Sequence, residues 1–299
     1  DLITVMEDAG NATEVFNADD ILSQLVTNIQ ALQIPNLDVT PLPSSIELST
    51  SDSSSFTLDV VDDAGSVNLD SFQEQVNVLT DLPNQCAHGR LVKIINTAEA
   101  GTAYWAKFKT EAGSGHGPGF WEETVDPNVS TGLLNASMPH ELTSDVPNVF
   151  DYIGIDWKDR LVGDDTTNSH PSFVNTEDPV TIQQAFLYNT RLGFLTKDNV
   201  SLSQAQDWYN FYYTSALTSL PSDPIDLSCS SIRPAVLHGV VPTAQGLILF
   251  SKNQQFIMFA GSDGPLTPSS AIIRSISNYE MDTNIDPVDI GSNINFVSK

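Results

Sequence analysis

Cationic residues are scarce in this chain of 299 residues. It has 12 Lys+Arg against 38 Asp+Glu, which gives a formal net charge of −26 at pH 7. A surface with this balance repels phosphate groups, so tight binding to nucleic acid is not expected. The composition is typical of a solvated acidic surface from a saline setting.

Long apolar runs and cysteines are also few. No stretch of ~18 apolar residues occurs, so no membrane-spanning helix is predicted. The chain starts without Met and without a basic segment leading into an apolar one. It is therefore expected to carry no secretion signal and to begin inside a longer protein. Cys86 and Cys229 are predicted to be free and hydrophobic, with a bridge between them as the alternative.

Motifs for catalysis and metal binding are missing. The glycine-rich run at 113–119 lacks the Gly-Lys-Ser/Thr ending of a phosphate-binding loop, and no Gly-x-Ser-x-Gly or EF-hand pattern occurs. No histidine has a second His or Cys at metal-ligand spacing. Carboxylate pairs suited to glycoside hydrolysis are expected by chance among 38 acids. We therefore predict no enzyme, and no catalytic, cofactor-binding or metal-binding residues. The histidines are His88, His116, His140, His170 and His238, and the acidic pairs are Asp62-Asp63, Glu122-Glu123, Asp164-Asp165 and Asp223 with Asp226.

Residues 1–79 are predicted to form a small α+β domain. Leu2–Val5 is expected as a short strand, and apolar residues at helical spacing predict one helix over 18–32, with Asn17 as its N-cap. Alternating residues at 46–48 and at 56–60, around a Ser/Asp turn at 50–55, predict a hairpin.

Residues 80–299 are predicted to be a β-rich domain. Strands are expected at 91–95 and 103–108 and again from 185, with a flexible loop at 113–119 and irregular connections over 143–181. Three segments repeat a turn that enters a strand with a buried Phe, at Phe194, Phe250 and Phe296. Their spacing is close to the ~40–50 residues of a propeller blade. The second copy predicts a hairpin of 247–251 and 255–260.

A set of short motifs, in a fixed order over about residues 78–299, resembles the tail nozzle family of short-tailed bacteriophages (podoviruses), also called tail tubular protein B. Each motif alone is weak, and their common order carries the resemblance. The motifs are the LP…G…VKI segment within 78–95, WEET at 121–124, MPHEL at 138–142, PSF at 171–173, NTRLGFL at 189–195, NFY at 210–212, DPID at 223–226, LTP at 266–268 and PVDIG at 287–291.

The resemblance implies a mainly β fold: irregular, propeller-like antiparallel sheets with a small inserted α+β domain. It implies a structural protein of the virion, located in the phage tail, that forms the distal tube through which viral DNA is ejected. The implied partners are a homo-hexameric ring, an adaptor ring of the tail tubular protein A kind, tail fibres, and double-stranded DNA that passes through the lumen without tight binding. An acidic lining would suit that passage. Family members are much longer, so an internal segment is expected.

Two other functions are compatible with the residues alone. One is a secreted, acidic, β-rich carbohydrate-binding or hydrolase domain from a saline organism, in which Trp105, Trp121, Trp157 or Trp208 stack on sugars. The other is a segment of a calcium-dependent adhesin. A glycan screen and a metal titration separate both from a virion protein.

Overall fold

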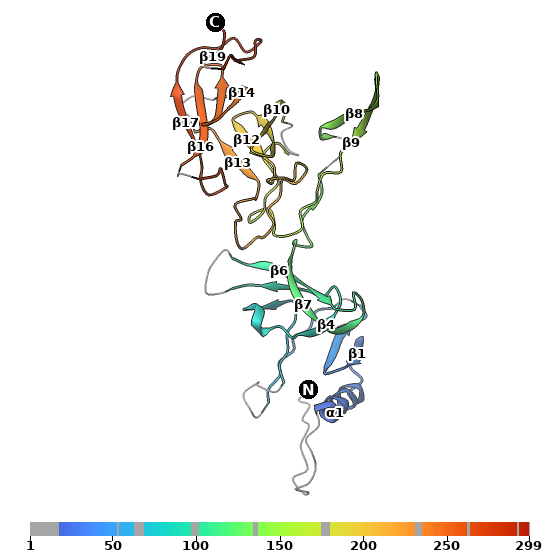
Figure 1. The fold of residues 1–299 in the computed structure, drawn as a ribbon. Helices are drawn as coiled ribbons and strands as arrows, with labels where there is room; N and C mark the ends of the chain where they lie inside the picture. Colours follow the sequence, from blue (N-terminus) through green and yellow to red (C-terminus); the bar gives the residue numbers. More distant parts are fainter. Residues whose placement is uncertain are drawn as a thin grey trace. The chain divides into compact units, whose positions relative to one another are not determined.

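The computed structural model describes residues 18–52, 54–62, 69–96, 102–133, 137–174, 180–230, 235–261, 264–291 and 293–298. The predicted strand at 2–5 and the N-cap at Asn17 lie outside these residues. The described part is mainly β, as predicted, with one α-helix and one short 3-10 helix (Figure 1). It contains no helix long and apolar enough to cross a membrane. The chain forms two compact units, Asp1–Glu122 and Glu123–Lys299, each described here by itself.

Unit 1 begins with a helix beside a hairpin. Helix α1 (Ala18–Ala31) confirms the prediction from helical spacing, and Asp19 and Asp20 lie in its first turn, where the helix dipole favours acids. Strands β1 (Leu37–Leu42) and β2 (Ser45–Thr50) pair antiparallel through a turn in which Ser44 has φ 61°.

The predicted hairpin partner for residues 46–48 is wrong. Strand β2 pairs with β1, whereas residues 56–60 form no strand, and Phe56 and Leu58 are exposed. Pro41 obscures β1 in the sequence. It is tolerated because β1 is an edge strand, where a missing N–H breaks no required ladder bond.

The rest of unit 1 is a five-stranded sheet in the order β3-β5-β6-β7-β4. Strand β3 (Gln75–Val76) is followed by the 3-10 helix η1 (Leu79–Asp81), then β4 (Gln85–Ala87), β5 (Leu91–Ile94), β6 (Tyr104–Thr110) and β7 (His116–Thr124). Val92, Ile94 and Ala106 are its buried centre. The strands predicted at 91–95 and 103–108 are confirmed. That residues 1–79 form a separate domain stays a prediction.

The loop predicted at 113–119 is shorter than expected, because β7 already begins at His116. Gly119 lies inside this strand. A Cβ there would sit 2.1 Å from the backbone oxygen of Lys109, so only glycine permits this approach. A glycine-rich run therefore marks a close strand contact as well as a turn.

Unit 2 is built around two four-stranded antiparallel sheets (Figure 1). The first contains β10 (Ile182–Tyr188), β11 (Arg191–Thr196), β12 (Asn199–Leu202) and β13 (Ile225–Ser228). The second contains β14 (Leu237–Thr243), β15 (Gly246–Ser251), β16 (Gln255–Ala260) and β17 (Ala271–Ser277). Within each sheet the strands follow chain order, which is the arrangement of a propeller blade.

The two sheets share one core. Leu195, Val200 and Leu202 from the first meet Leu247, Leu249 and Phe256 from the second, all fully or almost fully buried. On the side away from this core, the short strands β18 (Val288–Asp289) and β19 (Ile294–Asn295) belong to a segment that packs Phe296 on Phe250.

Two of the three predicted repeats occupy equivalent places. Phe194 and Phe250 each lie on the second strand of a four-stranded sheet and face away from the shared core. The hairpin predicted at 247–260 is β15 and β16. The third copy forms only the pair β18–β19. A closed propeller stays a prediction.

Residues 143–181 are not wholly irregular, which corrects the sequence prediction. Strands β8 (His140–Val146) and β9 (Val149–Gly154) form a hairpin, with Asn148 at φ 66° in its turn. Asp, Asn, Pro and Thr are abundant here and favour turns, and that signal hid the alternation of the two strands.

Candidate functional site: the motif cluster of unit 2

An aromatic cluster lies on the face of β10–β13 that is turned away from the shared core. Phe194, Phe211 and Phe173 come from three different motifs, and their ring centroids lie 4.9–5.4 Å apart. Trp157 packs beside them, 6.1 Å from Phe194. Aromatic pairs of this kind contribute about 0.5–1.5 kcal/mol beyond their buried area. Met138, from a fourth motif, joins the same cluster. Segments distant in sequence thus converge on one packed centre.

Gly193 lets β11 approach β10 closely. A Cβ at this position would lie 2.4 Å from the ring of Phe186 and 2.8 Å from the Leu202 side chain. This explains the Leu-Gly-Phe order of the motif: Phe194 fills the aromatic cluster, while Gly193 leaves room on the opposite face.

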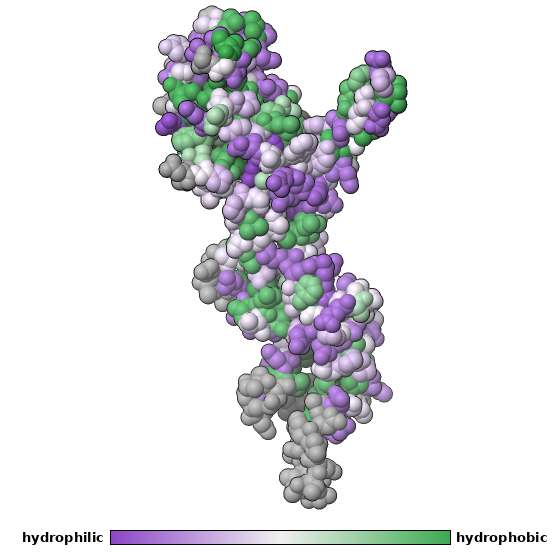
Figure 2. All heavy atoms as spheres, viewed as in Figure 1, coloured by the Kyte–Doolittle hydropathy of each residue, from purple (hydrophilic) through white to green (hydrophobic). Residues whose placement is uncertain are grey.

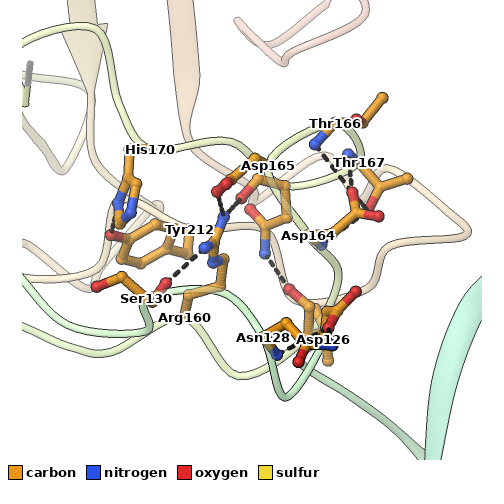
Figure 3. Close-up of polar contacts among 12 residues, drawn as sticks. Asp126, Asn128, Ser130, Arg160, Asp164, Asp165, Thr166, Thr167, His170 and Tyr212 are labelled. Atoms are coloured by element: carbon orange, nitrogen blue, oxygen red, sulfur yellow. Dashed lines mark hydrogen bonds and ion pairs between the residues drawn. The ribbon is translucent and has the colours of Figure 1, made fainter.

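Arg160 is fully buried, and its hydrogen bonds connect the loops that surround it (Figure 3). Its guanidinium donates to the Asp165 carboxylate at 2.8 Å and to the backbone oxygens of Asn168 and Ser130. The same group lies 6.0 Å from the ring centroid of Tyr212. The Asp165 side chain is 67% exposed, so this ion pair is only half shielded from water.

The loops around Arg160 are closed by short-range bonds. In Figure 3, Asp164 accepts from the backbone N–H of Thr166 and Thr167, and Asp126 accepts from Asn128. These are Asx turns, in which a carboxylate replaces a backbone acceptor. The acidic pair Asp164-Asp165 is therefore divided between a turn and an ion pair.

His170 and Tyr212 share a hydrogen bond of 2.6 Å beside Arg160 (Figure 3). Burial raises the pKa of Tyr212 to about 12, and the guanidinium of Arg160 opposes that shift. Burial, and then the charge of Arg160, lowers the pKa of His170 below its ordinary value. Both groups are therefore held in their neutral forms at neutral pH.

Arg191 is a second buried arginine, with 2% of its surface exposed. It donates to the backbone oxygens of Ser203, Pro221, Ser222 and Asp223 at 2.7–3.1 Å, and burial lowers its pKa. A guanidinium can serve several carbonyls at once because its donors are fixed in one plane. The motif arginine thus ties β11 to the loop that precedes β13.

The acids of the Asp-Pro-Ile-Asp motif have separate partners. Asp223 is fully buried and accepts from the Leu220 N–H and the Thr214 hydroxyl. Asp226 instead accepts from the backbone and hydroxyl of Ser172 and from Ser201. It therefore joins the Pro-Ser-Phe segment to β12.

Carboxylates of the other acidic pairs named from the sequence also have hydrogen-bond or ion-pair partners. Glu123 accepts from the Ser215 hydroxyl and the Ala216 N–H, while Glu122 forms an exposed ion pair with Lys109 at 2.7 Å. Asp63 lies outside the described residues. Their carboxylates consequently act in turns, ion pairs and loop contacts.

The histidines are dispersed. His88 contacts Thr110, His116 contacts Ser45, and His140 stacks on Tyr152 with centroids 4.7 Å apart. His238 lies half-buried in β14. Within the described ranges, no group of three or more His, Cys, Asp or Glu could hold a metal. Cys86 and Cys229 are free and buried, as predicted, and burial raises the pKa of Cys229 to about 12.

The four tryptophans have different environments. Trp157 is buried, and Trp121 donates to the Pro83 oxygen at 2.8 Å. Trp105 is half-buried beside Lys93, whereas Trp208 is 46% exposed and donates to Thr190. Trp105 and Trp121 belong to unit 1, and Trp157 and Trp208 belong to unit 2.

The sequence did not reveal that two of its few cations are internal. Arg160 and Arg191 are two of the 12 cationic residues, and both are buried. Arg191 is the first residue of the buried strand β11, where a charged side chain is unusual.

Two comparisons with known proteins agree with the motif order. Residues 3–299 match the family described as bacteriophage nozzle protein. Over 218 residues the chain is 31% identical to tail tubular protein gp12 of Escherichia phage T7. This alignment covers 73% of the chain and 26% of that relative, so the chain spans about a quarter of its length.

Proposed function

The chain belongs to the bacteriophage nozzle protein family and is a component of a phage tail, and we propose that it forms part of the wall of the distal tail tube through which viral DNA is ejected. In this proposal, six copies form a ring that is joined to an adaptor ring and to tail fibres. Viral double-stranded DNA passes through the lumen without being held, and the chain catalyses no reaction.

The observation that carries the structural role is the use of the motif residues. Arg191, Asp223 and Asp226 direct their polar groups to backbone and hydroxyl partners of the same unit. Phe194 and its aromatic neighbours fill a core. Motif residues with these internal partners stabilise the connections between strands, which the wall of a tube requires. The surface residues are then free to vary.

The charge distribution supports passage of DNA without adhesion. Of the 12 cationic residues, Arg160 and Arg191 are internal, and Lys109 and Lys158 are in ion pairs with acids. Because each lysine or arginine that contacts a phosphate adds affinity, a conduit poor in free cations binds DNA weakly. Repulsion from an acidic wall extends over ~8–10 Å at physiological salt.

The first experiment is electron microscopy of the purified chain. Sixfold rings are expected, and particles that stay monomeric at all concentrations, or rings of another symmetry, would contradict the proposed hexamer.

The second experiment measures binding to a labelled DNA duplex by gel shift at ~150 mM salt, where a continuous track of Lys and Arg would still bind. No retention is expected at micromolar protein. The variant Glu280→Lys, Asp286→Lys, which changes two exposed acids of unit 2, supplies a matched chain with added cations. Submicromolar binding by the unmodified chain would contradict passage without adhesion.

A further inference from the structure

Strands β9 and β17 each leave one edge without a partner in the described part of the chain. Strand β9 pairs only with β8, and β17 is the last strand of its four-stranded sheet. Every residue of β9 is exposed. A two-stranded hairpin is at best marginally stable in water by itself, and a free edge is a template for another strand. Both strands therefore have the geometry of strands that gain a partner by assembly.

The side chains on these two strands are complementary. Residues two apart on a strand share a face, so β9 presents Val149, Asp151 and Ile153 together. Strand β17 presents an apolar and a cationic residue on one face, Ile272 and Arg274, before a register shift between Ser275 and Ser277 interrupts the alternation. The three apolar residues on these faces, Val149, Ile153 and Ile272, are 46–51% exposed, and both charged residues are exposed as well. In Figure 2 the hairpin, at the upper right, carries hydrophobic and hydrophilic residues side by side.

Arg274 is the charge that selects this partner. Its guanidinium lies 4.8 Å from the ring centroid of Phe259, and no carboxylate among the described residues forms an ion pair with it. Two chains of net charge −26 repel each other, so a contact between them needs a cation facing an acid. Asp151 shares its face with apolar residues, as Arg274 shares its own face with Ile272, and this meets that need.

We propose that β9 of one copy pairs along the free edge of β17 of a second copy, with Asp151 opposite Arg274. The proposal rests on the ring assembly proposed above and names its interface. Ile272 then meets Ile153 if the strands run antiparallel and Val149 if they run parallel. Edge pairing supplies backbone hydrogen bonds, and the side chains fix the register.

This contact joins two different surfaces of the chain. Such a head-to-tail contact generates a ring when its rotation closes, whereas a twofold contact stops at a dimer. On the opposite face of β9, Tyr152 and Phe150 would continue the face of β17 that carries Ile273. The same pairing therefore covers apolar side chains on both faces of the hairpin.

Charge reversal tests the pairing in the full chain, with self-association measured by sedimentation velocity. Arg274→Glu and Asp151→Arg are each expected to weaken self-association by about tenfold or more, because each places like charges together. The double variant restores an opposite-charge pair and is expected to recover it. Lys252→Glu, which makes the same charge change in the turn between β15 and β16, is the matched control and should associate like the unmodified chain.

Disulfide trapping identifies the contacting copies. An Ile272→Cys chain is mixed with an isotope-labelled chain that carries Val149→Cys or Ile153→Cys. One of these two mixtures is expected to form a mixed disulfide, and the one that does gives the strand direction. Val149→Cys mixed with Phe120→Cys, which is exposed on unit 1, is the control. The native cysteines are buried and stay in place.

Three results would overturn the interface: no self-association of the unmodified chain, trapping no better than in the control mixture, or failure of the double variant to recover. Rings that persist unchanged in Arg274→Glu would refute this interface and leave the proposed ring standing. Absence of rings in every chain would refute the ring itself.

Discussion

Replacing Gly193 with alanine tests whether the nozzle motif is set by strand packing. The added Cβ would lie 2.4 Å from the ring of Phe186 and 2.8 Å from Leu202, two side chains of the shared core. Neither can move freely, because Phe186 is 9% exposed and Leu202 fully buried. Overpacking of this kind costs about 1–3 kcal/mol. Gly193→Ala should therefore lower the free energy of unfolding by that amount.

The measurement is urea unfolding followed by tryptophan fluorescence, which reports on Trp157 beside the aromatic cluster. Stability is read from the midpoint, provided that the slope with denaturant is unchanged. For a unit of this size, each kcal/mol corresponds to a shift in Tm of about 2–4 °C.

The matched control is Gly154→Ala at the end of β9, where a Cβ would meet nothing within 4 Å. That change should be neutral or stabilise by up to about 1 kcal/mol, since it restricts the unfolded chain. Adding Phe186→Leu to Gly193→Ala should recover part of the loss, because it removes the nearest ring atoms. Equal stability of Gly193→Ala and the unmodified chain, or no coupling with Phe186→Leu, would refute the packing argument.

Three further predictions concern the buried polar groups. Arg191→Met should destabilise unit 2 by about 3–5 kcal/mol, since four backbone oxygens lose the guanidinium and, among the described residues, only that of Ser222 keeps another donor, the Ala205 N–H. Arg191→Lys should recover only a part of this loss, because one ammonium cannot reach all four oxygens, and denaturation midpoints check both variants. The lowered pKa of His170 means that the folded state favours the neutral ring, so its contribution to stability is complete above pH 6.5 and is lost as pH falls below that value. The fall in Tm between pH 7 and pH 5 should therefore be smaller in His170→Gln, and an identical pH profile would contradict this. Purified chain should show no turnover of polysaccharides or nucleic acids; activity that disappears in Glu123→Ala or Asp223→Ala would contradict the assignment of these acids to loop contacts.

The sequence by itself determined the local elements whose signal is periodic. Apolar residues three and four apart predict α1, and strand alternation around a Lys-Asn-Gln turn predicts β15 and β16. These signals are local because helix and hairpin bonds join residues near in sequence. The motif order also gave the family without any knowledge of the contacts, since it depends on residue identity alone.

Only the tertiary structure decided which strands pair and which polar residues are internal. Strands β1 and β8–β9 were not predicted, because Pro41 and the turn-forming residues of 143–154 are typical of loops. Whether these segments pair depends on their partner strands rather than on local preference. Phe173, Phe194 and Phe211 are separated by 21 and 17 positions along the chain, yet their rings pack together. Arg160 and Arg191 are charged residues that any local rule places at the surface. They can be buried because carbonyl groups from distant loops surround each guanidinium, and that arrangement exists only once the chain has folded.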